Sequence, residues 1–248
     1  MRTAVLVSLM VMSMMLLSSV VIAVPAADED RDGAKLESSV KVWYRDDFVK
    51  PDGVGKPPKP PKDEGGNYEL LGRGVKWKTL PVDYVINPVN PEGLLQDDLV
   101  SAITASAGEW DSHTSADLFG AYTIDTTATY DDVTPDYKNE IMFGDLDEGI
   151  IGVTITWGYF GGPPGQRAII EFDMVLNTDF TWNVDGNAND MDVQNIVTHE
   201  LGHGVGLADL YDDADNKETM YGYSWEGDVD KRDLYYGDIA GIQELYGA

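Results

Sequence analysis

The stretch 197–209 constrains this chain more than any other part of its sequence. It holds two of the three histidines, His199 and His203, which are four residues apart, and Glu200 follows the first of them. On a helix, residues i and i+4 lie on one face, one turn apart, so both imidazoles can reach the same metal ion. Glu200 is next around the helix and can approach a water molecule on that ion. The spacing H-E-x-x-H therefore predicts a zinc-binding helix that also carries a general base.

A catalytic zinc takes three protein ligands and keeps a fourth position open, so two histidines do not make a complete site. Gly206 follows His203 by three residues, and Asp209 follows it by six. Glycine often ends a helix and accepts a positive φ at little steric cost. A chain that turns at Gly206 can bring Asp209 back toward the metal. We therefore expect His199, His203 and Asp209 to bind zinc, with Glu200 as the catalytic residue.

The complete pattern, H-E-x-x-H-x-x-G-x-x-D, resembles the extended motif of the metzincin zinc peptidases. Most metzincins carry histidine where this chain has Asp209, but snapalysin-type members use aspartate there. Three further segments resemble the matrixins, the subfamily that contains the catalytic domains of matrix metalloproteinases. They are residues 218–221, which are similar to the Met-turn under the zinc, the pair Phe172 and Asp173, and the final helix at 238–247. The resemblance extends from about Tyr68 to the C-terminus.

The resemblance implies the metzincin fold, an α+β fold with a twisted, mostly parallel five-stranded sheet and three helices. The zinc cleft would lie between an upper and a lower subdomain. Apolar periodicity in the sequence agrees with such a set of elements. The expected strands are 84–87, 122–125, 140–143, 153–157 and 168–176, and the first helix is 97–109.

The same resemblance assigns roles around the substrate. Strand 153–157 is expected to be the sheet edge that binds an extended substrate through main-chain hydrogen bonds. Met220 is expected to lie under the zinc, and Tyr221 and Tyr223 to belong to the wall of the substrate pocket. Gly206 is expected to shape the turn before the third ligand.

The expected function is that of a secreted zinc-dependent endopeptidase, acting as a monomer on extended polypeptide substrates. Its reaction would use a zinc-activated water, with Glu200 taking and returning a proton. Two other functions stay open at this point. One is a non-catalytic secreted metal-binding module, against which the presence of Glu200 argues. The other is a zinc hydrolase of cell-wall peptides, which the sequence does not separate from a protease.

Residues 1–26 are expected to be a signal peptide. Arg2 precedes an uncharged, mostly apolar run at 4–24, and small residues follow at Ala23, Ala26 and Ala27. This pattern predicts secretion with cleavage near Ala23 or Ala26. The alternative is an uncleaved membrane anchor, because a run of this length can also span a bilayer.

Residues 27–66 are expected to be a pro-segment with a proline-rich and glycine-rich linker, and residues 67–248 the peptidase domain. The region 28–66 has no strong hydrophobic period. Because the chain has no cysteine, a thiolate cannot occupy the zinc in a precursor. An aspartate from the pro-segment, Asp46, Asp47 or Asp52, could take that place, and the alternative interpretation of this segment is a disordered tail without such a role.

Charge is distributed unevenly along the chain. The net charge is −27, and the region from Thr79 to the C-terminus holds only 5 basic residues against 33 acidic ones. Such a body repels nucleic acid and anionic membranes, so neither is an expected partner, apart from a membrane that an uncleaved N-terminal anchor would enter. It favours cationic substrates and Ca²⁺, for which Asp145, Asp147 and Asp173 are the candidate oxygen ligands. The alternative is that the acidic residues serve solubility, for example in a high-salt habitat.

Overall fold

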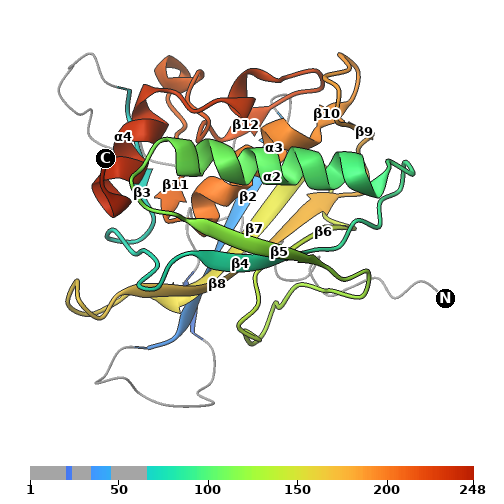
Figure 1. Ribbon diagram of the computed structural model, residues 1–248. Helices are drawn as coiled ribbons and strands as arrows, with labels where there is room; N and C mark the ends of the chain where they lie inside the picture. Colours follow the sequence, from blue (N-terminus) through green and yellow to red (C-terminus); the bar gives the residue numbers. More distant parts are fainter. Residues whose placement is uncertain (1–20, 24–34, 46–65) are drawn as a thin grey trace.

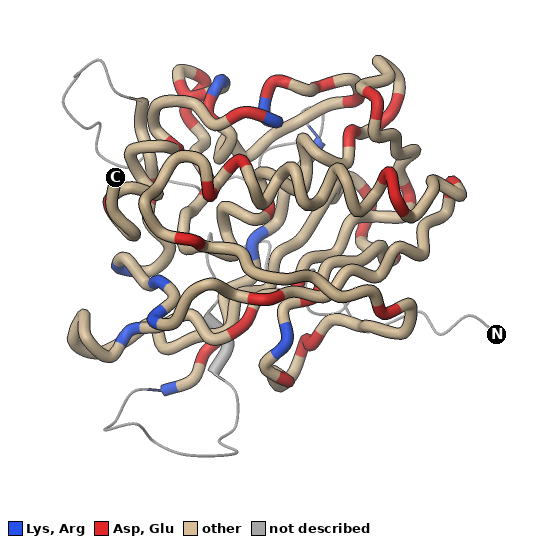
Figure 2. Tube along the Cα trace, in the orientation of Figure 1, with Lys and Arg blue, Asp and Glu red and all other residues tan. Residues whose placement is uncertain are grey.

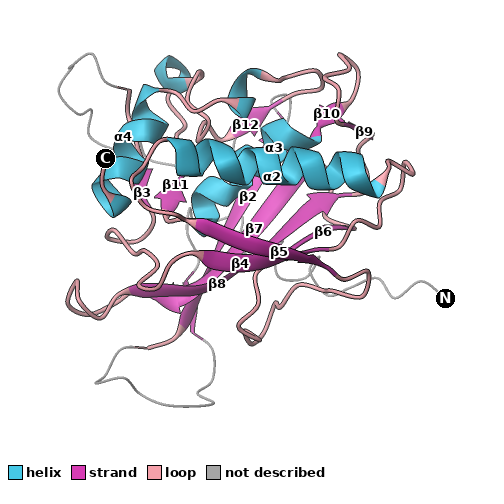
Figure 3. Cartoon of the chain, in the orientation of Figure 1, coloured by secondary structure: helices cyan, strands magenta, loops and turns pink. Residues whose placement is uncertain are grey.

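The computed structural model describes residues 21–23, 35–45 and 66–248. Its centre is one large sheet, and helices α2 (Gln96–Ser112) and α3 (Val193–Gly204) lie together against one face of that sheet (Figures 1 and 3). Helix α4 (Tyr236–Tyr246) packs near the end of α2, where Gln243 Nε2 donates to the carbonyl oxygen of His113 at 2.9 Å. The three expected helices are therefore present.

The five expected strands form the main part of the sheet. They are β4 (Val82–Ile86), β5 (Phe119–Ile124), β6 (Glu140–Gly144), β7 (Ile150–Tyr159) and β8 (Ala168–Asn177). Their order is β7-β8-β6-β4-β5, in which only β7 runs antiparallel to its neighbour. The mixed fold with a mainly parallel sheet and three helices is thus confirmed.

The sheet continues beyond β7 with a strand that the sequence did not predict. Strand β2 (Glu37–Arg45) comes from the expected pro-segment and pairs antiparallel with β7 along most of its length. Two short strands pair with β2 in turn: β1 (Val21–Ala23) is antiparallel to it and β12 (Tyr223–Ser224) is parallel to it. The absence of a strong period hid a short run of valine and aromatic residues at 40–44 that is suited to a strand.

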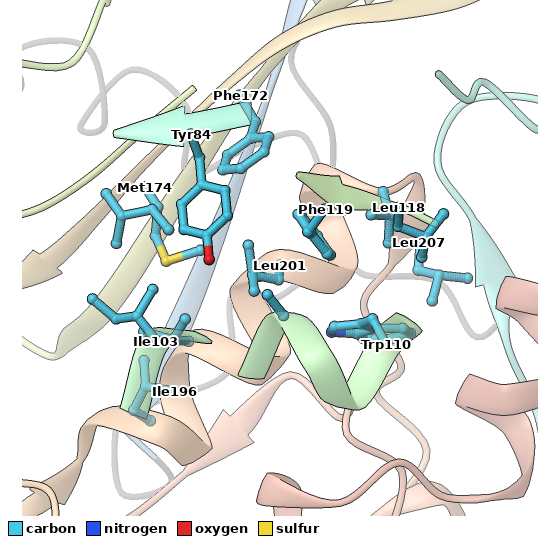
Figure 4. Close-up of a cluster of buried hydrophobic side chains, with 14 of the residues drawn as sticks. Tyr84, Ile103, Trp110, Leu118, Phe119, Phe172, Met174, Ile196, Leu201 and Leu207 are labelled. Atoms are coloured by element: carbon cyan, nitrogen blue, oxygen red, sulfur yellow. The ribbon is translucent and has the colours of Figure 1, made fainter. Parts of the chain in front are cut away.

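The main core lies between the sheet and the helices α2 and α3. Figure 4 shows Phe172 and Met174 from β8 in the same cluster of buried side chains as Trp110 from α2 and Leu201 from α3. Trp110 is fully buried, and its Nε1 donates to the carbonyl oxygen of Thr198 at 2.8 Å. A core tryptophan of this kind is worth about 3–5 kcal/mol relative to alanine. The bond ties α2 to α3 at the residue just before His199.

The remaining elements are short and position the loops around α3. Strand β3 (Glu69–Leu70) pairs antiparallel with β11 (Leu207–Ala208), and β9 (Trp182–Asn183) pairs parallel with β10 (Met191–Asp192). Two 3-10 turns, η1 (Asp213–Asp215) and η2 (Asp230–Arg232), lie in the C-terminal loops. Figure 2 shows acidic residues spread over most of these loops, as the charge distribution predicts.

Candidate metal centre

Helix α3 carries three of the expected functional side chains. His199, Glu200 and His203 are all fully buried, and the two imidazole centroids are 4.8 Å apart. His199 Nδ1 lies 2.7 Å from the carbonyl oxygen of Thr219, and His203 Nδ1 lies 3.0 Å from that of Leu207. Because a carbonyl oxygen can only accept, each Nδ1 carries the hydrogen. Both Nε2 atoms therefore keep a lone pair that can bind a metal.

The turn at Gly206 returns the chain to α3. The helix ends at Gly204, and Gly206 has a φ of 109°. A Cβ at this position would lie 2.5 Å from the carbonyl oxygen of Val75, so a side chain does not fit. After the turn, Asp209 Oδ1 lies 3.4 Å from His199 Nε2 and 3.3 Å from His203 Nε2. The structure therefore brings the three expected ligands together.

The atoms that face one another in this group suit a metal ion. His199 Nε2, His203 Nε2 and Asp209 Oδ1 are buried and have no hydrogen-bond partner. One ligand atom from each residue lies within 4.8 Å of the others. Leaving a buried polar atom without a partner costs about 1–3 kcal/mol. Two imidazole nitrogens and one carboxylate oxygen are donors that zinc accepts, and three protein ligands leave a position for water, so these residues fit a catalytic zinc.

The charges of the group depend on one another. Burial lowers the pKa of His199 to about 4, so its imidazole is neutral near pH 7. Burial also opposes charge on His203, but the Asp209 carboxylate outweighs burial and raises the pKa of His203. Burial opposes the charge on Asp209 as well, yet His203 and His199 hold the pKa of Asp209 well below its usual value. Asp209 and the two imidazoles thus shift one another's pKa values, and a metal ion would bind them in their deprotonated forms.

Glu200 is held in place by a hydrogen bond from the sheet rather than by contacts with the expected metal ligands. Its Oε2 accepts a 2.6 Å hydrogen bond from Thr154 Oγ1 of strand β7, and its Oε1 is buried without a partner. Burial raises the pKa of Glu200 to about 7, which is the range in which a carboxylate can both take and return a proton. Thr154 is a contributor that the sequence reasoning missed, because its role depends on a contact between distant segments.

The sequence comparisons agree with this geometry. A model of the matrixin family of peptidases matches residues 76–247, well over half of the chain. This chain belongs to the matrixin family. Membership makes the protein a metallopeptidase in general, with a catalytic zinc. No curated protein matches the chain.

The matrixin motif continues under α3 with the segment around Met220. Thr219 supplies the carbonyl that orients His199, and Met220 is buried with its sulfur against α3, where a Cβ on Gly202 would lie 2.2 Å from Sδ. Asp238 of α4 accepts hydrogen bonds from the backbone N–H groups of Thr219, at 2.6 Å, and of Met220, at 3.0 Å. Asp238 thus holds the segment that holds His199. The sequence placed this aspartate in the last helix but did not indicate its contact.

The two tyrosines expected in the pocket wall lie beyond Met220. Tyr221 and Tyr223 are both buried, and their ring centroids are 5.6 Å apart. Tyr221 OH donates to Asp213 Oδ1 at 3.2 Å. Tyr223 begins strand β12, which pairs with β2 through Tyr44. The expected wall of the substrate pocket in this matrixin is therefore in contact with strand β2, which the sequence did not predict.

Strand β2 lies directly over the metal centre of the matrixin. Trp43 is fully buried and stacks on the His199 imidazole, with ring centroids 3.8 Å apart and planes 11° from parallel. Lys41 Nζ lies 3.6 Å from Asp209 Oδ2, the oxygen that faces away from the histidines. The expected plug residues Asp46, Asp47 and Asp52 lie outside the described residues.

The three candidates for Ca²⁺ in this matrixin do not form one group. Among the described residues, two sets of potential ligands converge: the metal centre, and the set Asp131, Asp136 and Glu171. Asp145 and Asp147 belong to neither set. Asp173 is fully buried beside the second set, and its Oδ2 accepts from the backbone N–H of Asp131 at 2.7 Å.

The N-terminal part of the matrixin is described only in pieces. Most of the expected signal peptide, residues 1–20 and 24–26, lies outside the described residues, as does the linker at 46–65. None of the helices in the described ranges is long and apolar enough to cross a membrane.

Proposed function

We propose that this matrixin is a secreted zinc-dependent endopeptidase that cleaves extended polypeptides. The observation that carries the proposal is the convergence of three buried, unpartnered ligand atoms beside Glu200. These atoms belong to His199, His203 and Asp209, and in this proposal Asp209 is the third ligand. A purely structural metal site is closed by a fourth protein ligand, and within the described residues three side chains converge here.

Different residues of the chain have different roles in the proposed reaction. When bound, zinc supplies a Lewis acid that polarises a carbonyl and lowers the pKa of a water molecule. Glu200 takes the proton from the attacking water, returns it to the leaving amine, and is held in place by Thr154. Thr219 and Leu207 fix the imidazoles through Nδ1, so the ligands need no reorientation during the reaction.

The path of the substrate follows from the position of β7. This strand carries Thr154, which contacts Glu200, and its edge already pairs with an extended segment, β2. A polypeptide that took the place of β2 would make the same main-chain hydrogen bonds, a form of β-augmentation. It would pass over His199, as Trp43 does now. The edge of β7 therefore suits any extended polypeptide, and side-chain selectivity would come from the wall at Tyr221 and Tyr223.

Secretion rests on the N-terminal segment. The charged start, the apolar run and the small residues near Ala23 and Ala26 are those of a cleaved signal peptide. Expression of the full chain followed by N-terminal sequencing of the protein in the medium tests this part. A new N-terminus near residue 24 or 27 is the expected result, and an intact N-terminus in the membrane fraction would replace secretion with anchoring.

The activity is tested by hydrolysis of unfolded casein. The full chain is produced with a site for a specific protease inserted in the 46–65 segment, and the assay is run after that site is cut. Glu200→Gln is compared with Glu244→Gln, which changes a glutamate at the surface of α4. We expect Glu200→Gln to keep its zinc and lose activity by about 10²–10⁴-fold, and Glu244→Gln to remain active. A cut, zinc-loaded wild-type protein without activity would favour the non-catalytic metal-binding module.

The same reasoning assigns a function to β2, on condition that the protein is a peptidase. This strand occupies the edge of β7 that a substrate needs, and its Trp43 covers His199. Tryptophan is a hydrogen-bond donor only, so Trp43 blocks the centre without binding a metal. Lys41 adds a charge contact to Asp209. We propose that residues 37–45 keep the intact chain latent as an internal pseudo-substrate strand, in place of the aspartate plug expected from the sequence.

Activation in this scheme requires β2 to leave. A cut in the 46–65 segment separates β2 from the body at residue 66 and turns an intramolecular contact into an intermolecular one. The effective concentration that keeps the strand in place is then lost. A substrate at working concentration can compete for the same edge of β7 only after that cut.

Latency is tested in the intact, uncut chain with Trp43→Ala. Trp225→Ala is the matched control, because Trp225 is 45% exposed whereas Trp43 is fully buried. Losing a buried tryptophan costs about 3–5 kcal/mol, so activity should rise by tenfold or more in Trp43→Ala only. Removal of zinc by a chelator should also become faster, which gives a reading independent of activity. An intact wild-type chain that is as active as the cut chain would refute latency while leaving the peptidase in place.

A further inference from the structure

Half of the basic residues in the acidic body of this protein are gathered at one end of it. Four of the eight lysines and arginines in residues 66–248 lie in segments 71–78 and 161–167, neither of which contains an acidic residue. Figure 2 shows the contrast with the rest of the chain, where acidic residues predominate. Segment 161–167 connects β7 to β8 (Figure 1), so this end adjoins the strand edge proposed for substrate. We call it the basic end, and its residues are Arg73, Lys76, Lys78 and Arg167.

Contacts between the two segments join them into one surface at the end of β7. Arg167 Nη1 donates to the carbonyl oxygen of Arg73 at 2.7 Å. A Cβ on Gly72 would lie 3.2 Å from the ring of Phe160, the residue that follows β7. The first segment is therefore packed against the connection that leads from β7 to β8, and the charges of both segments are presented together.

No carboxylate in the described part of the chain forms an ion pair with the basic end. Elsewhere in the body, Lys138, Lys231 and Arg232 each pair with an aspartate. Lys76 has a structural role, because its Nζ donates to the carbonyl oxygen of Leu245 near the C-terminal end of α4. The other three cations have no comparable partner, and placing them together costs free energy through their mutual repulsion.

These three cations keep donors that can bind an external anion. Arg73 and Lys78 are exposed, and Lys78 Nζ makes only a long contact of 3.4 Å with the carbonyl oxygen of Pro164. Arg167 uses Nε and Nη1 for the carbonyl oxygens of Gly162 and Arg73, and its Nη2 forms no hydrogen bond within the described residues. A guanidinium held in this way is oriented to bind a carboxylate from outside.

Strand β2 indicates which part of an extended polypeptide reaches the basic end. Its Trp43 stacks on His199, and its Glu37 pairs with Gly158, next to the last residue of β7. Because a strand advances about 3.3 Å per residue, these two positions of β2 lie about 20 Å apart along the edge. Earlier residues of a polypeptide in the same place would pass the basic end. The chain itself has this charge pattern, since residues 28–37 contain five acidic and two basic residues.

We propose that Arg73, Lys78 and Arg167 form an exosite, a secondary binding site for acidic segments of polypeptide substrates. The bound segment would lie six or more residues before the residue that takes the place of Trp43. This inference rests on the proposed peptidase function and adds a selectivity to it. The net charge alone predicts a preference for cationic substrates. The local charges dominate at this end, because salt screens exposed charges that lie more than about 8–10 Å away.

Selectivity is tested with matched peptides and the cut, zinc-loaded protein. The peptides share one cleavable core identified in a casein digest, and four upstream residues are acidic in the first peptide, amides in the second and lysines in the third. One exposed ion pair changes binding by about 1.5–5-fold. We therefore expect kcat/KM to be about tenfold higher for the acidic peptide than for the amide peptide at low salt. The difference should lie in KM and disappear in about 1 M salt.

Charge reversal locates the selectivity. Arg73→Glu should lower the ratio of the two kcat/KM values by about threefold or more, and Arg73→Glu with Lys78→Glu should bring it to about one. Lys217→Glu makes the same change of charge at an exposed lysine in another loop and should keep the wild-type ratio. A wild-type preference for the lysine peptide, or equal ratios in Arg73→Glu and Lys217→Glu, would overturn the exosite.

Hydrolysis of casein separates failure of the exosite from failure of the peptidase. A cut protein that cleaves casein without the expected ratio has lost only the exosite. Binding of the fluorescently labelled acidic peptide to Glu200→Gln, measured by anisotropy, gives a second reading that needs no hydrolysis. We expect Arg73→Glu in that background to weaken binding by about threefold or more, and Lys217→Glu to leave it unchanged. Equal binding by both would also overturn the proposal.

Discussion

The metal centre on α3 and the carboxylate cluster on β8 both bury unpartnered ligand atoms, but they are built differently. The first takes its donors from eleven consecutive positions, from His199 to Asp209, and mixes two neutral nitrogens with one carboxylate. The second takes carboxylates alone from two strands and a loop, namely Asp131, Asp136, Glu140, Glu171 and Asp173. The donor atoms favour zinc at the first and Ca²⁺ at the second. The comparison indicates that a metal site can be predicted from sequence when its ligands lie close together in the chain, as they do at 199–209.

The largest effect is expected from a substitution that removes zinc from the metal centre and leaves the carboxylate cluster unchanged. His203→Ala removes a ligand from the metal centre, so the purified protein should contain no zinc above background. Activity should fall by at least about 10²–10⁴-fold, which is the loss that follows removal of a general base. The rise in Tm on addition of Ca²⁺, which we expect from the carboxylate cluster in wild type, should remain, as measured by thermal unfolding. Loss of both zinc and the Ca²⁺ response would show that the two regions are not independent.

A smaller effect is expected from the support behind His199. Asp238→Ala removes the acceptor for the backbone N–H groups of Thr219 and Met220. Because Thr219 orients His199, zinc affinity should fall by about 10–100-fold, as is typical for an indirect partner. Competition with a chelator measures this change. Asp233→Ala, a nearby change that leaves those two N–H groups bonded, should bind zinc as wild type does.

The pH dependence of stability should come partly from the carboxylate cluster. Burial raises the pKa values of Glu140, Glu171 and Asp173 to about 7, 9 and 8. The folded chain therefore holds protons more tightly than the unfolded chain, so the contribution of these groups to stability is fully present below their ordinary pKa values of 3.8 to 4.5 and is lost progressively until the pH has risen through 7 to 9. Asp131 and Asp136 add negative charge, and Lys138 opposes it only from the surface.

This loss is measured as the Tm in EGTA between pH 5.5 and 9. We expect the Tm to fall with pH in wild type and to fall less in Glu171→Gln or with Ca²⁺ present. The difference between the two proteins isolates the cluster from other buried acids such as Glu218. Parallel curves for wild type and Glu171→Gln would mean that the cluster does not contribute.

The smallest expected effect concerns the two aspartates that the sequence indicated for calcium. Asp145 and Asp147 lie outside the convergent set, so replacing both by asparagine should leave the Ca²⁺ affinity unchanged within error. Calorimetry of the double variant measures this. A large loss of affinity would restore the ligand set expected from the sequence and exclude the one centred on Glu171.

The sequence predicted those parts of the fold that depend on local pattern. The resemblance to the matrixins predicted five main strands and three helices, apolar periodicity agreed with their positions, and the spacing of His199, His203, Gly206 and Asp209 located the metal centre. Thr154, Asp238 and the carboxylate cluster were not predicted as contacts, because each acts on a segment far away in the chain. Strand β2 was missed for a related reason, since it becomes a strand by pairing with β7 rather than by its own periodicity.

The pairing of β2 with β7 has a consequence for solubility. Strand β7 contains three isoleucines, one valine and two threonines among its ten residues, a composition that is prone to form intermolecular β-sheets. A long uncovered edge strand of this kind is a template on which other chains can add. In the intact chain β2 covers that edge, so the newly made protein folds without an aggregation-prone border. Release of β2 would leave a protein that self-associates more readily at high concentration when no polypeptide is bound.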